Sequence, residues 1–216
     1  MKRLIIYDLD GTLVDTREDI AAAANHMLAR MNGKTLSAEE VSRYVGRGLQ
    51  ALIQGCLGTE DPKTLEKGSK IYRDYYARHM LDSSRLYPGA REVLDYFKER
   101  KQAVITNKPN PFSSELLKAL GASDYFFEII PGNSGHPKKP DPGAISHLMK
   151  AQKAGPAETL FIGDSLIDIE TGRNAGVETV VLTHGFGTPD ELQSAAPAAI
   201  FENFGELLQA AKKRDW

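Results

Sequence analysis

Two aspartates, Asp8 and Asp10, directly follow a short apolar run near the start of the chain, in the segment RLIIYDLDGTLVD. The run at 4–7 predicts a buried strand, and Gly11 permits a sharp turn after it. In open parallel sheets, ligands bind at the carboxyl ends of the strands. The two carboxylates are therefore expected to face a crevice, although a solvated turn rich in Asp and Gly is the alternative.

Polar side chains recur after two later predicted strands, at 102–106 and 159–162. With the first strand included, the polar residues at the strand ends are Asp8, Asp10, Thr106, Asn107, Asp164, Ser165 and, one helical turn on, Asp168. Because parallel strands all end at the same edge of the sheet, we expect these side chains to converge on one crevice. Each further coincidence weakens the alternative of unrelated turns.

Carboxylates gathered in one crevice repel one another and raise one another's pKa unless a cation lies between them. A hard ion that prefers oxygen ligands resolves this repulsion. Mg²⁺ suits the pattern, because it binds one or two carboxylates together with carbonyl and water oxygens and leaves positions open for a substrate phosphate. The sequence therefore predicts a magnesium site at this edge.

Lys138 and Lys139 lie in the segment HPKKPDP, whose prolines favour an extended, fixed loop. A lysine beside an acidic cluster either pairs with it or binds a phosphate there. The Thr106 hydroxyl can donate to a second phosphoryl oxygen. Exposed surface charge is the alternative for either lysine.

The elements that must position these residues fall into two regimes. Residues 16–83 show helical patterns only: a helix begins after Thr16, Ser37 and Glu40 have the spacing of a capping box, and two helices follow between 48 and 83. From 87 onward helices and strands alternate. The later strands are predicted at 102–106, 126–131, 159–162, 179–182 and 198–201, and helices at 89–100, 111–120, 141–153, after 165 and at the C-terminus.

This alternation predicts an α/β fold, with a Rossmann-like parallel sheet covered by helices on both faces (three-layer α/β/α). The sheet would be built from residues 1–15 and 84–216. The all-helical stretch 16–83 would be a small domain inserted after the first strand.

Composition excludes several classes of function. The net charge of −2 and the pI near 6.2 give no sign of a nucleic-acid partner. Cys56 is the single cysteine, which rules out an intramolecular disulfide and fits a reducing compartment. No stretch approaches the ~18 apolar residues of a membrane span. We expect a cytoplasmic protein with a small-molecule substrate and no membrane partner.

The motifs, taken together and in this order, resemble the haloacid dehalogenase superfamily, in particular its phosphatase branch. The matching segments are DLDGTLVD at 8–15, ITN at 105–107, KPDP at 139–142 and GDSLID at 163–168. Four further segments are similar to the phosphoglycolate phosphatase group: DTREDIAAAAN, VGRGL, YPGARE and GRNAGV. The helical insertion stands where that family carries its cap domain.

The resemblance implies a role for each motif residue. Asp8 would attack phosphorus and form an aspartyl phosphate, and Asp10 would serve first as general acid and then as general base. Mg²⁺ would be held by Asp8, the backbone carbonyl of Asp10 and Asp164. The phosphoryl group would bind Thr106, the backbone of Asn107 and Lys139.

Two residues keep open roles. Asp168 would be a further metal ligand or would orient Lys139. Arg47, between two glycines of the cap, would offer a guanidinium to a substrate carboxylate, or else be a solvated arginine in a turn.

The leading functional hypothesis is a Mg²⁺-dependent phosphatase acting on a small phosphorylated metabolite, with 2-phosphoglycolate as the first guess. One alternative is a phosphoglucomutase-like transferase whose cap holds back water. The other is a phospho-acceptor signalling domain of the receiver type. In such a domain the phospho-acceptor Asp follows the acidic pair and precedes the hydroxyl and the lysine, which differs from the order found here.

Overall fold

A six-stranded parallel sheet forms the centre of the protein in the computed structural model, which describes residues 1–216. In spatial order its strands are β5 (Glu128–Ile130), β4 (Lys101–Ile105), β1 (Leu4–Tyr7), β6 (Thr159–Gly163), β7 (Glu178–Leu182) and β8 (Ala199–Phe201). The first strand of the chain lies in the middle, between β4 and β6. The ends of these three strands therefore lie side by side, and the predicted parallel sheet is confirmed.

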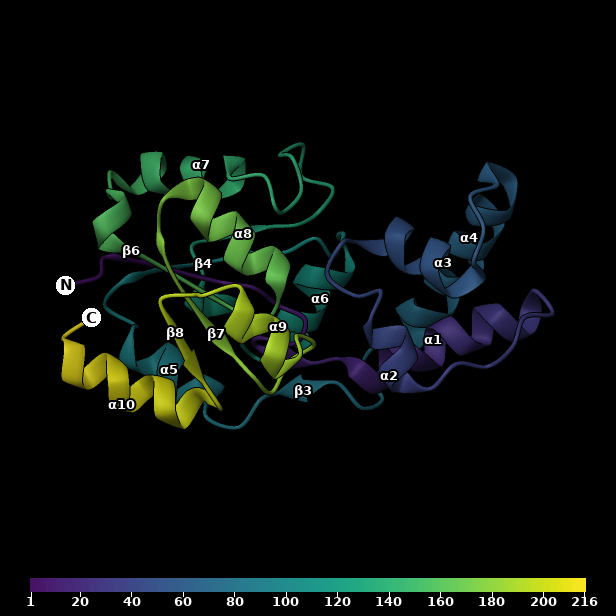
Figure 1. The fold of residues 1–216 in the computed structure, drawn as a ribbon, viewed down its shortest axis with the longest axis horizontal. Helices are drawn as coiled ribbons and strands as arrows, with labels where there is room; N and C mark the ends of the chain where they lie inside the picture. The colour runs from purple at the N-terminus through teal and green to yellow at the C-terminus, as the bar shows by residue number, and fades with distance from the viewer.

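Helices cover both faces of this sheet, as Figure 1 shows for α7 and α8 on one side and α5 and α10 on the other. One layer comprises α5 (Ala90–Tyr96), α6 (Phe112–Ala119) and α10 (Phe204–Arg214), and the other α7 (Gly143–Gln152), α8 (Leu166–Ala175) and α9 (Pro189–Ser194). Within β1, Ile5 and Tyr7 pack in the first layer and Leu4 and Ile6 in the second. Both faces of the strand are fully buried, which explains its continuous apolar sequence.

Four helices between β2 and β3 pack around a hydrophobic cluster of their own. These helices, here called the helical unit, are α1 (Arg17–Arg30), α2 (Ala38–Ser42), α3 (Leu49–Leu57) and α4 (Pro62–His79). The predicted capping box is confirmed: Ser37 Oγ accepts from the Glu40 N–H, and the Glu40 carboxylate accepts from the Ser37 N–H. We propose that this unit is the cap domain expected over 16–83.

The chain passes between the sheet and the helical unit twice, and the two passages are joined. The strands β2 (Val14–Asp15) and β3 (Arg85–Leu86) form a two-stranded antiparallel ladder. Beside it, the buried carboxylate of Asp19 accepts hydrogen bonds from the backbone of Ser83 and from the backbone and hydroxyl of Ser84. This ladder was not predicted, because two residues are too few to show a strand pattern.

Several predicted boundaries need correction. The helices expected at 89–100, 111–120 and 141–153 are shorter, and the strand expected at 126–131 covers 128–130 only. Thr16 precedes α1 as expected, but its side chain accepts no capping hydrogen bond, and its hydroxyl donates to Asp10. The helix α9 was missed, although Thr188 and Glu191 form a capping box at its start. None of the helices has both the length and the apolar character that crossing a membrane requires.

Candidate active site

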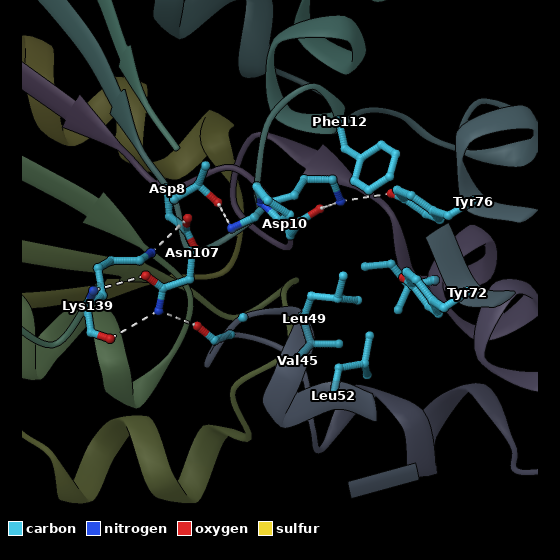
Figure 2. A pocket seen from close by; sticks show the side chains of 16 residues that line it. Asp8, Asp10, Val45, Leu49, Leu52, Tyr72, Tyr76, Asn107, Phe112 and Lys139 are labelled. Carbon is cyan, nitrogen blue, oxygen red and sulfur yellow. Dashed lines mark hydrogen bonds and ion pairs between the residues drawn. The ribbon is translucent and has the colours of Figure 1, made fainter. Parts of the chain in front are cut away.

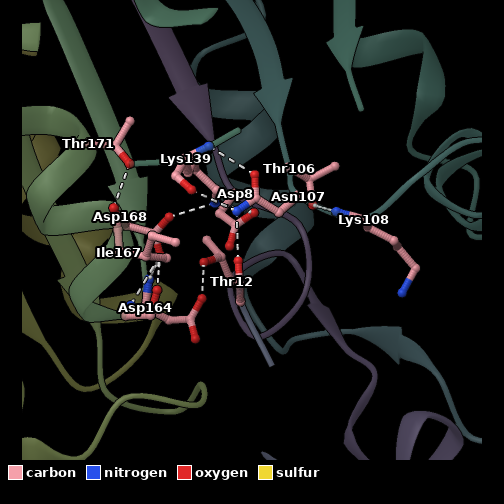
Figure 3. Close-up of polar contacts among 12 residues, drawn as sticks. Asp8, Thr12, Thr106, Asn107, Lys108, Lys139, Asp164, Ile167, Asp168 and Thr171 are labelled. Atoms are coloured by element: carbon pink, nitrogen blue, oxygen red, sulfur yellow. Dashed lines mark hydrogen bonds and ion pairs between the residues drawn. The ribbon is translucent and has the colours of Figure 1, made fainter. Parts of the chain in front are cut away.

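The predicted site residues meet at the carboxyl ends of β1, β4 and β6, on the side that faces the helical unit. A cavity lies between this edge and the unit (Figure 2). The predicted residues that line it are Asp8, Asp10, Thr106, Asn107 and Lys139. Two others, Asp164 and Asp168, lie beside Asp8 (Figure 3). The side chains that were predicted to converge because parallel strands end at one edge of the sheet do lie together.

Asp8, Asp164 and Asp168 form a compact carboxylate cluster. Each has an oxygen within 4.8 Å of the others, and all three side chains are buried. Gly11 makes this approach possible: its φ is +83°, and a Cβ there would collide with the Asp164 carboxylate. The strand end and the turn after it thus leave room for a second carboxylate beside the first.

The electrostatics of the cluster call for a cation. Burial raises the pKa of Asp8 to about 7, since the nearby Lys139 only partly offsets burial and the charge of Asp168. The pKa of Asp164 is raised well above its ordinary value, first by burial and then by Asp168 and Asp8. One Asp8 oxygen, Oδ1, is buried and accepts no well-aligned hydrogen bond. An oxygen-only donor set with one such atom fits a hard divalent ion.

Lys139 is the cation that the chain itself supplies to this cluster. Its Nζ lies 2.8 Å from Asp8 Oδ1 and 2.6 Å from Asp168 Oδ1, and its side chain is 4% exposed. Burial alone would lower the pKa of Lys139, but the two carboxylates outweigh it and raise the pKa, so the ammonium stays charged.

Both oxygens of Asp168 are bonded within the chain. Besides Lys139 on Oδ1, its Oδ2 accepts from the backbone N–H of Asp164 and from the backbone and hydroxyl of Ser165. A carboxylate held on both oxygens fixes the position of its lysine partner. These contacts favour the orienting role over that of a further metal ligand.

Asn107 connects three parts of the site through its side chain. Its Nδ2 donates to the carbonyls of Gly46, 2.8 Å away in the helical unit, and of Lys139, 3.0 Å away. Its Oδ1 accepts from the Lys139 N–H at 2.9 Å. The sequence predicted a role only for the Asn107 backbone, yet the amide side chain ties the lysine loop to the helical unit.

Lys108 was missed by the sequence analysis. Its Nζ donates to Asp10 Oδ1 at 2.7 Å and to the Tyr76 hydroxyl of α4 at 2.8 Å. Its backbone N–H donates to Thr106 Oγ1, which leaves the threonine proton free to point elsewhere. Its place directly after Thr106 and Asn107 was the available signal, but nothing in the sequence indicated that the side chain reaches Asp10.

Arg47 is the one predicted site residue that does not join the others. It is exposed and does not line the cavity, whereas its neighbours Gly46 and Gly48 do. The helical unit instead presents an apolar wall, made by Ile20, Val45, Leu49, Leu52, Tyr72 and Tyr76. The expected contact between Arg47 and a substrate carboxylate is not supported by this placement.

The architecture and the site together define a class of hydrolase. The family model of haloacid dehalogenase-like hydrolases matches residues 5–182. The chain belongs to the haloacid dehalogenase-like hydrolase family, which confirms the resemblance found in its motifs.

Similar proteins indicate which branch of that family the chain resembles. A phosphoglycolate phosphatase of Vibrio parahaemolyticus is 33% identical over 96% of this chain and 95% of its own length. One of Pseudomonas putida is 33% identical over 96% of this chain and 79% of its own length. The solved structure of a predicted phosphoglycolate phosphatase from Haemophilus somnus superposes with a TM-score of 0.92, at 30% identity, over 97% of this chain and 98% of that one. These relatives belong to the phosphatase branch that the motifs resemble.

Proposed function

We propose that this protein is a Mg²⁺-dependent phosphatase that hydrolyses 2-phosphoglycolate or a closely similar small phosphate ester. The observation that carries the proposal is the environment of Asp8. This buried carboxylate lines the cavity, its Oδ1 lies 2.8 Å from the ammonium of the fixed Lys139, and a second acid, Asp10, lines the same cavity. Such a carboxylate can attack a phosphorus atom in the cavity.

The reaction proceeds in two displacements. Asp8 attacks phosphorus, the bond to the ester oxygen breaks, and Asp10 gives its proton to the departing alkoxide. Water then attacks the aspartyl phosphate while Asp10 takes up a water proton, which releases inorganic phosphate and regenerates Asp8. Through both steps Lys139, the Thr106 hydroxyl and the Asn107 backbone hold the phosphoryl oxygens.

Asp8, the backbone carbonyl of Asp10 and Asp164 would hold the metal ion. When bound, Mg²⁺ neutralises carboxylate charge and stabilises the charge of the transferring phosphoryl group. The raised pKa values of Asp8 and Asp164 support this assignment, because a cation among these groups would favour their ionised forms. Asp168 orients Lys139.

The dimensions of the cavity support a small substrate. Its volume is only about 60 Å³, roughly the share of two water molecules in the liquid. Hydrogen bonds from Asn107 and Lys108 to the helical unit join its two walls. This arrangement favours a two-carbon ester over the sugar phosphate that the transferase alternative requires. The names of the relatives support 2-phosphoglycolate.

A location in the cytoplasm is part of the same proposal. Cys56, the single cysteine, is a free thiol in the interior of the helical unit, which fits a reducing compartment. A small phosphorylated metabolite would be met there.

Phosphate release from a panel of small esters tests the proposal. The natural chain should hydrolyse 2-phosphoglycolate best, with Mg²⁺ present and not with a chelator. Asp8→Asn should reduce turnover at least about 10⁴-fold while the protein stays folded, since the amide is close to isosteric with the carboxylate. Activity that survives in Asp8→Asn, or that ignores the chelator, would refute the mechanism. Isomerisation of a sugar phosphate without release of phosphate would favour the transferase.

A further inference from the structure

Lys108 is a buried cation of the cavity wall to which the proposed reaction gives no task. Its side chain is 6% exposed, although lysine is seldom buried to that extent without a partner. It pairs with Asp10 and also lies over the Tyr76 ring, 4.7 Å from the centroid. Figure 3 shows this side chain extending away from the carboxylate cluster. The positive charge of Lys108 therefore stands apart from that of Lys139, which is proposed to bind the phosphoryl group.

The two lysines of the cavity differ in how fully they are neutralised. Lys139 has two carboxylate partners, Asp8 and Asp168. Lys108 has one carboxylate partner, Asp10, and one neutral phenol. An ammonium carries three N–H donors, so one donor of Lys108 has no partner within the chain. This lysine can therefore bind a further anion that enters the cavity.

The distances allow that anion to be part of the substrate. The proposed acid Asp10 must come within hydrogen-bond reach of the ester oxygen, and Lys108 Nζ is 2.7 Å from Asp10 Oδ1. Asp10 Oδ1 already accepts from Thr16 and Lys108, so the ester oxygen would meet Oδ2. Two hydrogen bonds and the width of the carboxylate then put the ammonium at most about 7–8 Å from the ester oxygen. A carboxylate on the carbon next to the ester carbon lies within this range.

The rest of the wall leaves no other charged partner for such a carboxylate. In the cavity that Lys108 lines, the helical unit presents Val45, Leu49 and Tyr72, and Phe112 adds a further ring (Figure 2). A carboxylate against such side chains without a cation would lose its hydration uncompensated. The cavity thus has one position on its far side where a second anion is stabilised.

We propose that Lys108 is the residue that selects substrates, by binding a carboxylate carried close to the phosphate ester, while Tyr76 of the helical unit holds its ammonium in place. This inference rests on the proposed phosphatase function and deepens it. It assigns the choice of an anionic ester to a core lysine and not to Arg47. The helical unit contributes the hydroxyl that orients this lysine.

The test compares two esters of nearly equal size, 2-phosphoglycolate and 2-hydroxyethyl phosphate, whose far ends are charged and neutral. In Lys108→Gln the ratio of their kcat/KM values should shift against 2-phosphoglycolate by about 10- to 100-fold, the contribution of a hydrogen bond to a charged group. A decrease in kcat/KM that is equal for both esters measures how much the ion pair with Lys108 contributes to the action of Asp10. The exposed Lys150 provides a charge-matched control, and Lys150→Gln should keep the natural ratio.

Tyr76→Phe provides a milder variant that keeps the ring packed against Phe112, at a centroid distance of 5.2 Å. It should shift the same ratio in the same direction by about 3-fold, because only the orienting hydroxyl is lost. If Lys108→Gln fails to fold in a thermal melt, this variant carries the test. A ratio that stays unchanged, or an equal loss on both esters, overturns the proposal.

Binding separates this inference from the proposed function. In the Asp8→Asn background, with Mg²⁺ present, calorimetry should find that adding Lys108→Gln weakens binding of 2-phosphoglycolate much more than that of 2-hydroxyethyl phosphate. This comparison needs no turnover. Absence of phosphate release from any ester would refute the phosphatase, whereas equal weakening of both ligands would refute the role of Lys108.

Discussion

The two walls of the cavity are made in opposite ways. The wall from the sheet edge consists mainly of charged and polar groups, all but Asp10 buried and each held by partners: Asp8, Asp10, Thr106, Asn107, Lys108 and Lys139. The wall from the helical unit is almost wholly apolar, apart from the tyrosine hydroxyls and the backbone of Gly46 and Gly48. The first wall carries the reacting groups and Lys108, the proposed selector of charge, and the second wall limits the size of what reaches them. Reaction and selection by size are thus separated between two parts of the chain.

The walls also differ in what they contribute to stability. Burial of charged groups costs free energy that their ion pairs only partly return. The helical unit gains from burying apolar side chains such as Ile53 and Met27, each of which stabilises by about 1.5–3 kcal/mol. We therefore expect single changes at the sheet edge to act strongly on both stability and activity. Changes on the apolar wall should act weakly and mainly on substrate choice.

The largest combined effect on stability and turnover is expected for Lys139→Met. The change leaves Asp8 and Asp168 buried without their shared cation, and loss of one partner of a buried pair costs about 3–5 kcal/mol. Phosphate release should fall at least about 10³-fold, because the phosphoryl group loses a fixed positive charge. Thermal and urea unfolding measure the first effect, and a phosphate assay the second.

The neighbouring Lys138 provides the control for that variant. It is exposed, so Lys138→Met makes the same chemical change one residue away and should alter neither stability nor turnover much. If the two variants were equally stable, the buried charges of the sheet edge would not depend on one another as described above.

The next effect concerns pH and metal. The pKa of Asp8 is about 7 in the folded protein against 3.8 ordinarily, so the folded state prefers the protonated form. The associated stability is fully present below about pH 4 and is lost as the pH rises to about 7. Without metal, the melting temperature of the natural chain should therefore fall over this range more steeply than that of Asp8→Asn.

Magnesium should reverse this trend, because the ion binds the ionised carboxylates. The increase in melting temperature on adding Mg²⁺ should be small at pH 5, grow through pH 7 and be largely absent in Asp164→Asn. Melts at several pH values, with chelator and with Mg²⁺, measure it. An increase that does not depend on pH would mean that the ion binds outside the carboxylate cluster.

The sheet edge is also the part that the sequence predicted well. Strand patterns located β1, β4 and β6, and a parallel sheet must bring their ends together whatever the details of the loops. That is why the sequence alone assigns Asp8, Asp164 and Thr106 to one crevice. The helical unit could be recognised as helical, but its position over the crevice could not be derived from periodicity.

The sequence did not predict side-chain contacts between residues far apart in the chain, because no spacing or periodicity links such residues. Lys108 reaches Asp10 and Tyr76, which lie 98 and 32 positions away along the chain. The Asn107 amide bonds to Gly46 across the boundary of the helical unit. Arg47 was singled out for its charge between two glycines, yet its side chain is exposed. Side-chain direction on the loops of the cavity depends on packing between the two parts, and residue type alone does not encode it.

The smallest effect is expected on the apolar wall, for Leu49→Ala. Leu49 begins α3 and is only half-buried, so its truncation should cost little more than about 1 kcal/mol of stability, well below the cost of a core leucine. The wider cavity should lower kcat/KM for 2-phosphoglycolate by only about 3-fold, since a few lost methyl contacts weaken a small ligand slightly. Esters with a longer or branched alcohol should gain in relative rate. Kinetics on a series of alkyl phosphates measure this shift, with the exposed Leu81→Ala as the matched control. A large loss on every ester would show that the apolar wall takes part in the chemistry, and the separation of reaction from selection by size would not hold.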